Sequence, residues 1–481
     1  MPINGFLYPG AKVTLPYQVD NSLRFNDGDS AYLNITPSSA SNRKTWTWSS
    51  WVKLGTISGD KGVFSASSDD SNRNSINIVD EGYIIFDYEV GGTRYLVSTQ
   101  DARYRDPSAW FHIVVAVDTT QSTSTNRVKI YVNGSQVTLS TIVNGYPPEN
   151  ADMFINNNVA HSIGKQTWGS AHYDGYIAEA VLIDGSALTP SSFGEFDEDS
   201  PTIWKPKDVS GLTFGTNGFY LEFKQSGTSQ NSSGLGADTS GNDNHFASNN
   251  LAATDQSTDT CTNNFATFNP AAPTTDITLS EGNLKGVYGT SGTRTVQTST
   301  FGLSSGKWYW EIKIGGSTSP NNAMVGITQL STDTNTVLGT ADNSWAYRGY
   351  DGKVYHNNAD EGGSLDTFTD GDIIGIALNL DNLQGSLHKL YFSKNGTFQN
   401  GADPTDFTSA TGVYGVDDNV DYFPAVSDAG SSATPQFEIN FGSPSFSISS
   451  GNSDANGYGN FEYAVPSGFY AINSKNLAEF G

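Results

Sequence analysis

The chain has 481 residues, a length that fits two to four domains rather than one. Its net charge of −25 leaves few lysines and arginines to neutralise phosphates, so nucleic acid is not an expected partner. The single cysteine, Cys261, cannot form an internal disulfide, and no segment approaches the roughly 18 apolar residues that span a bilayer. We therefore expect no membrane insertion and a fold that rests on hydrophobic cores.

Residues 1–20 form the first segment and carry apolar anchors such as Phe6 and Tyr17, but no pattern that folds alone. They are expected either to dock on a partner as an extended arm or to pack on their own domain. The stretch Met1–Gly5 lacks the basic and apolar regions of a signal peptide, which predicts synthesis in a cytoplasm without a membrane anchor.

From about residue 21 onward, apolar and polar residues alternate with a period of two, while helical periodicity is almost absent. Lys129–Gly134, Tyr309–Ile314 and Gln436–Phe441 are examples of this alternation. The chain also holds 51 glycines, which favour short strands and many turns. We therefore predict an all-β protein of antiparallel sandwiches.

Five segments within residues 21–196 carry a recognisable order and spacing. They are Thr47–Lys53, Trp110–Asp118, Val128–Gly134, Tyr173–Glu179 and Ala187–Thr189. The series resembles the laminin G and concanavalin A-like lectin superfamily, which implies an antiparallel jelly-roll sandwich. The Asn133-Gly134 pair supplies the residues with positive φ that a tight hairpin needs.

The tryptophans of this first module differ in their surroundings. Trp46, Trp48, Trp51 and Trp110 lie in alternating strands, which favours core or core-edge positions, with one of them lining a sugar platform as the alternative. Trp168 lies in a loop between glycine and polar residues, so it is the best aromatic candidate for ligand contact in this module.

Residues 197–275 are expected to be an ordered connector, because the phenylalanines at 219, 223, 246 and 268 need a core to pack in. The turn at 238–246 resembles one near the start of many laminin G-like domains. Its oxygen ligands are suited to Ca²⁺, a hard cation, and the candidate metal residues are Asp238, Asn242, Asp243 and Asn244. The alternative is a network of Asx turns that holds the loop without metal.

Residues 276–481 contain a second ordered series of motifs. It comprises Glu281–Leu284, Ser305–Ile312, Met324–Ile327, Gly371–Leu378, Leu390–Gly396, Tyr422–Ser427 and Glu438–Gly442. This order resembles that of SPRY domains. The resemblance implies a bent antiparallel sandwich that binds protein or peptide through variable loops and has no catalytic group.

An aromatic stretch at 345–355 holds the candidate ligand-binding residues of this second module. They are Trp345, Tyr347, Arg348, Tyr350 and Tyr355. If exposed, such a cluster of aromatic residues around an arginine is typical of an interface hot spot. The alternative is a strand that packs inward.

Catalytic motifs are missing from the sequence. The six histidines are scattered singly, and no nucleophile elbow, phosphate-binding glycine loop or zinc motif is present. Concanavalin A-like folds include glycosidases with paired acids, so Asp87, Glu89 and Glu179 are the acids to inspect. No arrangement of catalytic acids is apparent, and we predict that the protein is not an enzyme.

The lectin-like module, the connector and the SPRY module together resemble virion structural proteins of tailed bacteriophages, especially marine ones. The resemblance implies a tail-associated or fibre-like homo-oligomer in the virion, assembled in the host cytoplasm. It would bind a host surface glycan or protein through its loops, with residues 1–20 contacting other virion proteins. Two alternatives stay open: a capsid decoration or tail-collar subunit without a receptor role, and a polysaccharide depolymerase.

Overall fold

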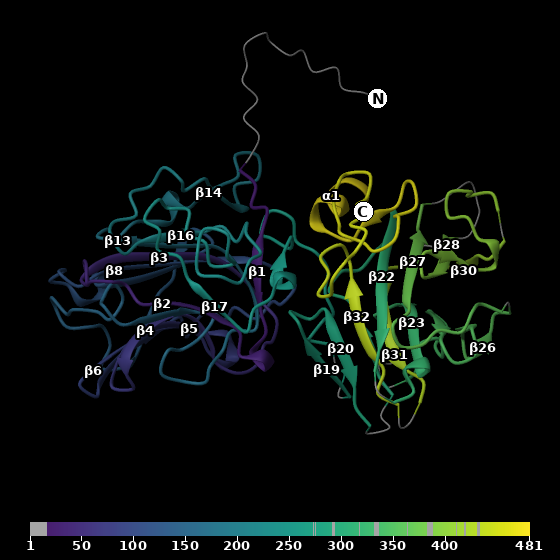
Figure 1. The fold of residues 1–481 in the computed structure, drawn as a ribbon, viewed down its shortest axis with the longest axis horizontal. Coiled ribbons are helices and arrows are strands. Elements are labelled where there is room, and N and C mark those ends of the chain that lie inside the picture. The colour runs from purple at the N-terminus through teal and green to yellow at the C-terminus, as the bar shows by residue number, and fades with distance from the viewer. Residues whose placement is uncertain are drawn as a thin grey trace, which may run out of the picture.

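Two β lobes lie side by side in the protein, the first in purple to teal and the second in green to yellow (Figure 1). The computed structural model describes residues 17–481 except 273, 275, 291–293, 317, 331–335, 363, 382–387, 410, 418–419 and 431–432. Residues 1–16 of the expected arm lie outside the described residues. The predicted all-β fold with two sandwiches is confirmed.

The first lobe consists of two sheets and a short hairpin. One sheet has the order β10 (Ser135–Gln136), β9 (Val128–Val132), β8 (Phe111–Asp118), β3 (Thr45–Leu54), β13 (Gly175–Asp184), β1 (Ser22–Phe25), β18 (Gln256–Ser257), and β16 (Phe219–Leu221) also pairs with β13. The other has the order β11 (Ser140–Val143), β7 (Thr93–Ser98), β6 (Ile84–Val90), β5 (Asn72–Ile78), β4 (Lys61–Asp69), β12 (Ala160–Ile163), β2 (Tyr32–Ile35), β17 (Ala247–Asn249). The hairpin is β14 (Gly194–Phe196) and β15 (Trp204–Pro206).

The second lobe is also a pair of sheets. The larger has the order β19 (Ile277–Ser280), β20 (Lys285–Tyr288), β32 (Gln436–Asn440), β22 (Lys307–Gly315), β27 (Ile373–Asn379), β28 (His388–Lys394), β29 (Thr397–Phe398), with β30 (Tyr414–Val416) beside β28 and β33 (Tyr470–Ala471) parallel to β22. The smaller has the order β21 (Val296–Thr298), β31 (Phe423–Asp428), β23 (Ala323–Thr328), β24 (Ser344–Arg348), β25 (Lys353–His356), β26 (Ala359–Asp360).

Helices are short in the described part of the chain. The α-helix is α1 (Ser474–Phe480), and the 3₁₀ helices are η1 (Asp27–Asp29), η2 (Asp80–Gly82), η3 (Ser124–Asn126), η4 (Pro190–Ser192), η5 (Ala253–Asp255), η6 (Pro320–Asn322) and η7 (Gln399–Gly401). None of the helices among the described residues is long and apolar enough to cross a bilayer.

The described part of the segment 197–275 is ordered, and much of it belongs to the first sandwich. Its strand β16 pairs with β13, β17 pairs with β2, and β18 pairs with β1. The side chains of Phe219 and Phe246 lie in the first core, whereas Phe268 lies in the second. The sequence suggested a separate connector because these strands have only two or three residues, too few for a visible alternation.

The hairpin between β9 and β10 illustrates how local residues set the backbone. Asn133 and Gly134 adopt φ values of 47° and 79°, as the sequence predicted for this turn. Gly134 has a second role, because any Cβ there would overlap the indole of Trp204. The β14–β15 hairpin can therefore pack directly on this turn.

Each lobe has its own aromatic core. Trp46 and Trp48 are fully buried between the sheets of the first sandwich, and Trp48 stacks on Phe64 with ring centroids 4.3 Å apart. Trp308 and Trp310 occupy the corresponding layer of the second. The interpretation of Trp46, Trp48 and Trp51 as core residues is confirmed by their burial.

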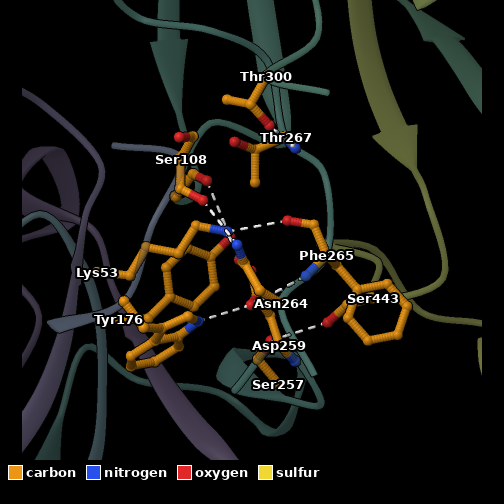
Figure 2. Close-up of polar contacts among 12 residues, drawn as sticks. Lys53, Ser108, Tyr176, Ser257, Asp259, Asn264, Phe265, Thr267, Thr300 and Ser443 are labelled. Carbon is orange, nitrogen blue, oxygen red and sulfur yellow. Dashed lines mark hydrogen bonds and ion pairs between the residues drawn. The ribbon is translucent and has the colours of Figure 1, made fainter. Parts of the chain in front are cut away.

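A buried ion pair lies where the two lobes meet (Figure 2). The Lys53 ammonium on β3 is 2.7 Å from the Asp259 carboxylate, and both side chains are at most 2% exposed. Lys53 also donates to Asn264 Oδ1 at 2.7 Å and to the Phe265 carbonyl at 2.9 Å, so all three of its N–H groups are used. The chain leaving the first sandwich is thereby held against β3.

The Asp259 carboxylate holds further groups on its second oxygen. Trp110 Nε1 donates to Asp259 Oδ1 at 2.9 Å, and the backbone N–H of Phe265 donates to the same atom at 3.3 Å. The ring of Phe265 packs in a cluster with residues of the second lobe, such as Tyr309. Asp259 therefore links residues of the first sandwich to the segment that enters the second.

Direct contacts between the two domains surround this ion pair. Tyr176 donates its hydroxyl to the Gly282 carbonyl at 2.9 Å, and Asn283 Nδ2 donates to the Gly55 carbonyl at 2.6 Å. Arg24 is buried and pairs with Glu281 at 3.2 Å. These bonds connect strands of one lobe to the turn between β19 and β20 of the other, so the lobes are docked rather than loosely tethered.

Removing one partner of the buried pair should be costly. We expect Asp259→Ala to lower the free energy of unfolding by about 3–5 kcal/mol, because the Lys53 ammonium then stays buried without a counter-charge. Urea denaturation measures this loss. The double variant with Lys53→Met should recover much of it, and Glu222→Ala, which breaks a pair with half-exposed Lys224, should cost less than about 1 kcal/mol. Equal effects of Asp259→Ala and Glu222→Ala would contradict this account.

Candidate functional site

The loop that carries Trp168 lies directly on the outer face of the first sandwich. Ser65 on β4 donates its hydroxyl to the Lys165 carbonyl at 2.7 Å and accepts from the backbone N–H of Thr167 at 3.0 Å. Gly62 permits this approach, since a Cβ there would overlap the backbone at Gln166. The half-buried indole of Trp168 is therefore held against the sheet by its loop.

Arg73 on β5 lies beside Trp168 and belongs to a network of charged residues on β5, β6 and β7. The Arg73 guanidinium carbon lies 4.9 Å from the centre of the Trp168 ring, and Arg73 pairs with Glu89 at 2.6 Å. Arg94 forms two hydrogen bonds with Asp87, of 2.8 and 3.0 Å. Strand pairing sets this arrangement. Glu89 on β6 lies opposite Arg73 on β5 and, on its other side, opposite Arg94 on β7. We call Arg73, Asp87, Glu89, Arg94 and Trp168 the Trp168 surface.

These pairings decide what the two acids of the Trp168 surface can do. Asp87 and Glu89 point to the same side of β6, as alternate residues of a strand must. Both are engaged by arginines, which is unlike the pair of a protonated acid and a free carboxylate that glycoside hydrolysis needs. The surface offers instead an indole beside fixed donors and acceptors, which suits the apolar faces and hydroxyls of a sugar.

In the second lobe, the structure separates the predicted aromatic stretch into two groups. Trp345 and Tyr347 lie in the core of the SPRY lobe, 1% and 0% exposed, so neither is available to a ligand. They alternate along β24 with the outward-facing Arg348, and the sequence alone did not tell which face was buried. The inward-packing alternative holds for these two residues.

The remaining residues form a surface cluster at the β24–β25 turn. Arg348 pairs with Asp351, and its guanidinium carbon lies 4.7 Å from the centre of the Tyr355 ring. Tyr355 donates its hydroxyl to Asp351 at 2.7 Å, while Tyr350 is 63% exposed. We call Arg348, Tyr350, Asp351 and Tyr355 the Tyr350 surface. An exposed tyrosine beside a fixed arginine is a typical contact residue at protein interfaces.

The candidate calcium turn is held by its own hydrogen bonds. Asp238 Oδ1 accepts from the backbone N–H groups of Tyr220 and Ser240, and Oδ2 accepts from the Ser240 hydroxyl and the Asn244 N–H, all at 2.9 Å. The amides of Asn242 and Asn244 both donate to the Gly218 carbonyl at 2.9 Å. Asp243 points to solvent, 3.6 Å from His245.

This pattern is the Asx-turn network that was the alternative to a metal site. Each carboxylate oxygen of Asp238 accepts two hydrogen bonds from groups of the protein. Among the described residues, no group of three or more His, Cys, Asp or Glu side chains is placed to hold a metal ion. Calcium binding by this turn stays a prediction that a titration would test.

Glu179, the third acid, is buried at a β-bulge in β13. The bulge lies between Ala178 and Val181, and Glu179 itself has a φ of 52°. Its Oε2 accepts hydrogen bonds from Tyr220 at 2.6 Å and from Tyr17 at 3.1 Å. Burial raises the pKa of Glu179 to about 7, against the lowering effect of the two tyrosine hydroxyls. No second acid among the described residues hydrogen-bonds to it, so its contacts favour a structural role.

Two domain families account for most of the described chain. Residues 27–192 match the model of the concanavalin A-like lectin/glucanases superfamily, and residues 307–440 match the SPRY domain. The protein is thus an all-β chain with a concanavalin A-like domain followed by a SPRY domain, as the sequence motifs indicated. No curated protein matches the chain.

Several solved structures are similar to parts of it. The SPRY domain of human HERC1 is 25% identical, with 32% of this chain and 86% of that chain covered and a TM-score of 0.25. A putative carbohydrate binding protein from Bacteroides ovatus is 14% identical, with 49% and 60% covered and a TM-score of 0.32. A SAP-like pentraxin from Limulus polyphemus is 18% identical, with 36% and 78% covered and a TM-score of 0.27.

The sequence pointed to Trp168 as a candidate but not to its neighbour Arg73. Arg73 and Trp168 are 95 positions apart, and nothing local marks Arg73 as different from any other strand residue. The pairing of β5 with β6 and the position of the loop over β4 are needed to bring them together. A surface of this kind is therefore visible only after the sheet has formed.

The buried Glu179 should give the stability of the protein a definite pH dependence. A carboxyl whose pKa rises on folding contributes stability at low pH, and this contribution is lost as pH rises from about 4.5 to about 7. Glu179→Gln, which cannot ionise, should therefore be more stable relative to wild type at pH 8 than at pH 4, by about 1–3 kcal/mol. Urea denaturation across this range measures the difference.

The control is Glu462→Gln, because hydrogen bonds from Ser449 lower the pKa of Glu462 rather than raise it. Between about pH 5 and pH 8 this variant should keep the wild-type slope. A Glu179→Gln variant whose slope equals that of wild type would refute the link between burial and ionisation at this bulge.

Proposed function

We propose that the protein is a non-enzymatic carbohydrate-binding protein and that its concanavalin A-like domain contacts the sugar through the Trp168 surface. The observation that carries the proposal is a half-buried indole fixed beside Arg73 and its carboxylate partners. Sugars present apolar C–H faces, which pack on aromatic rings, and hydroxyls, which pair with fixed polar groups. The match of residues 27–192 to a superfamily that includes lectins supports the same class of ligand.

The proposal of a binding role rather than a hydrolytic one has its own support. Asp87 and Glu89 are ion-paired with arginines, and Glu179 is buried beneath two tyrosines. Neither arrangement offers a general acid opposite a free carboxylate. Release of reducing sugar from a bound polysaccharide would overturn the non-enzymatic assignment and favour a depolymerase.

A second candidate function is protein recognition by the SPRY domain. Its support is the Tyr350 surface, where a 63% exposed tyrosine lies next to an arginine fixed by Asp351. Tyrosine and arginine dominate the binding energy of many protein interfaces. The experiment below separates the two candidates, because they use different domains.

We expect the full chain to bind a subset of oligosaccharides on a glycan array, and Trp168→Ala to weaken that binding at least tenfold through the loss of ring contact. Tyr350→Ala is the matched control, since it removes an aromatic residue from the other domain. Isothermal titration with the selected glycan measures both affinities. If Tyr350→Ala abolishes glycan binding and Trp168→Ala leaves it intact, the assignment to the concanavalin A-like domain is wrong.

We further propose that the protein acts on the particle of a tailed bacteriophage, as a tail-associated or fibre-like subunit that contacts the host surface. The resemblance of the domain combination to virion proteins supports this, and repetition by symmetry would strengthen weak sugar contacts through avidity. Oligomerisation and contact with other virion proteins belong to the same proposal.

Particles that lack the protein provide the test. We expect them to stay intact but to adsorb to host cells much more slowly than complete particles, as measured by the decay of free infectious particles. Normal adsorption together with fragile particles would favour the alternative of a capsid decoration or tail-collar subunit. Absence of the protein from purified particles, measured by mass spectrometry, would exclude the virion role.

A further inference from the structure

A groove runs along the junction between the two domains. One hollow of about 330 Å³ is lined from the first sandwich by residues near Asn21 and Thr258 and from the SPRY lobe by residues near Ser447 and Asn460. A second hollow of about 200 Å³ adjoins it and shares Thr258. Because both domains supply the walls, the groove exists only while the domains are docked.

The lining of the larger hollow is uncharged. Every residue that lines it is apolar, an amide or a hydroxyl, although the chain as a whole carries a net charge of −25. A cation or an anion would meet no opposite charge there. The larger hollow is therefore suited to a neutral ligand.

Polar side chains in the larger hollow are also unused within the protein. In the described part of the chain, five of them have no side-chain hydrogen bond. They are Asn21, Thr254, Thr258, Ser447 and Asn460. Three come from the first sandwich and two from the SPRY lobe, so they face the same hollow from both sides. Amides and hydroxyls both donate and accept, which is also the property of sugar hydroxyls.

Apolar surface accompanies these polar groups. Ile448 and Phe446 contribute to the wall of the larger hollow, and Tyr458 contributes to the smaller one. A small apolar wall beside several amides and hydroxyls can contact both the C–H faces and the hydroxyls of a small uncharged polyol. A volume of about 330 Å³ lies within the range of small-molecule sites, roughly 300–1,000 Å³.

The walls are held rigidly by the junction. Ser257, which adjoins Thr258, shares a hydrogen bond of 2.8 Å with Ser443 of the SPRY lobe. Asp259, on the other side of Thr258, is fixed by Lys53. A groove whose shape is set before binding loses little conformational entropy when a ligand enters.

We propose that the larger hollow of this inter-domain groove is a second carbohydrate site, which binds an uncharged saccharide across the two domains. The inference rests on the proposed carbohydrate-binding function and adds to it a site and a ligand charge. It also gives the docking of the two domains a role in recognition.

The test uses the full chain and an array that pairs neutral oligosaccharides with acidic counterparts. Thr258→Trp should fill the groove and weaken binding of a neutral glycan at least tenfold. Thr258 and Thr93 are both exposed, so Thr93→Trp on the β6–β7 hairpin is the matched control and should bind like wild type. Asn460→Ala, a milder change, should cost about three- to tenfold through the loss of a hydrogen bond.

The outcomes separate this inference from the function on which it rests. Loss of neutral-glycan binding in Thr258→Trp and Asn460→Ala, with unchanged melting temperatures, supports the groove. Binding that is lost in Trp168→Ala but intact in both groove variants overturns the groove and leaves the proposed function standing. Selection of acidic over neutral glycans by the groove overturns the charge assignment, and binding of no saccharide by wild type overturns both proposals.

Discussion

A lysine and an aspartate that are both withdrawn from water fix the segment that leads from the first sandwich into the SPRY lobe. Charges buried this deeply are tolerated only where every donor and acceptor finds a partner, and Lys53 and Asp259 meet that condition. The partners come from β3, from the strand region around Trp110 and from the segment that enters the SPRY lobe. Because the ring of Phe265 packs with residues of the second lobe, the pair fixes where the SPRY lobe begins relative to β3.

The docked arrangement of the two domains creates a groove that neither domain has alone. The groove at Thr258 has one wall from each sandwich, and its shape depends on the segment between Ser257 and Asp259. The Trp168 and Tyr350 surfaces, in contrast, each lie within one domain. A chain with both kinds of surface can contact a ligand at separate points, which suits recognition of an extended or repeated polymer.

Several arginines of this acidic chain pair with carboxylates on a neighbouring strand or in the same turn. Arg73 and Arg94 are committed to carboxylates on neighbouring strands, and Arg348 is committed to Asp351 in its own turn. Such pairs also fix the orientation of the aromatic residues beside them, because an arginine held by a carboxylate stays next to the ring that it contacts. The larger hollow of the inter-domain groove differs, because its lining has no charged side chain. Five of its polar side chains lack partners within the described residues.

The sequence by itself determined the fold class, because period-two alternation and turns such as Asn133-Gly134 are local and depend on neighbouring residues only. It also marked Trp168 and the stretch at 345–355 as places of interest. Tertiary structure alone decided which face of β24 was buried, since alternation does not say which side meets the core. It likewise placed strands of only two or three residues within the first sandwich. It also brought Lys53 to Asp259, 206 positions away. Such contacts form between whole sheets rather than between neighbours in sequence.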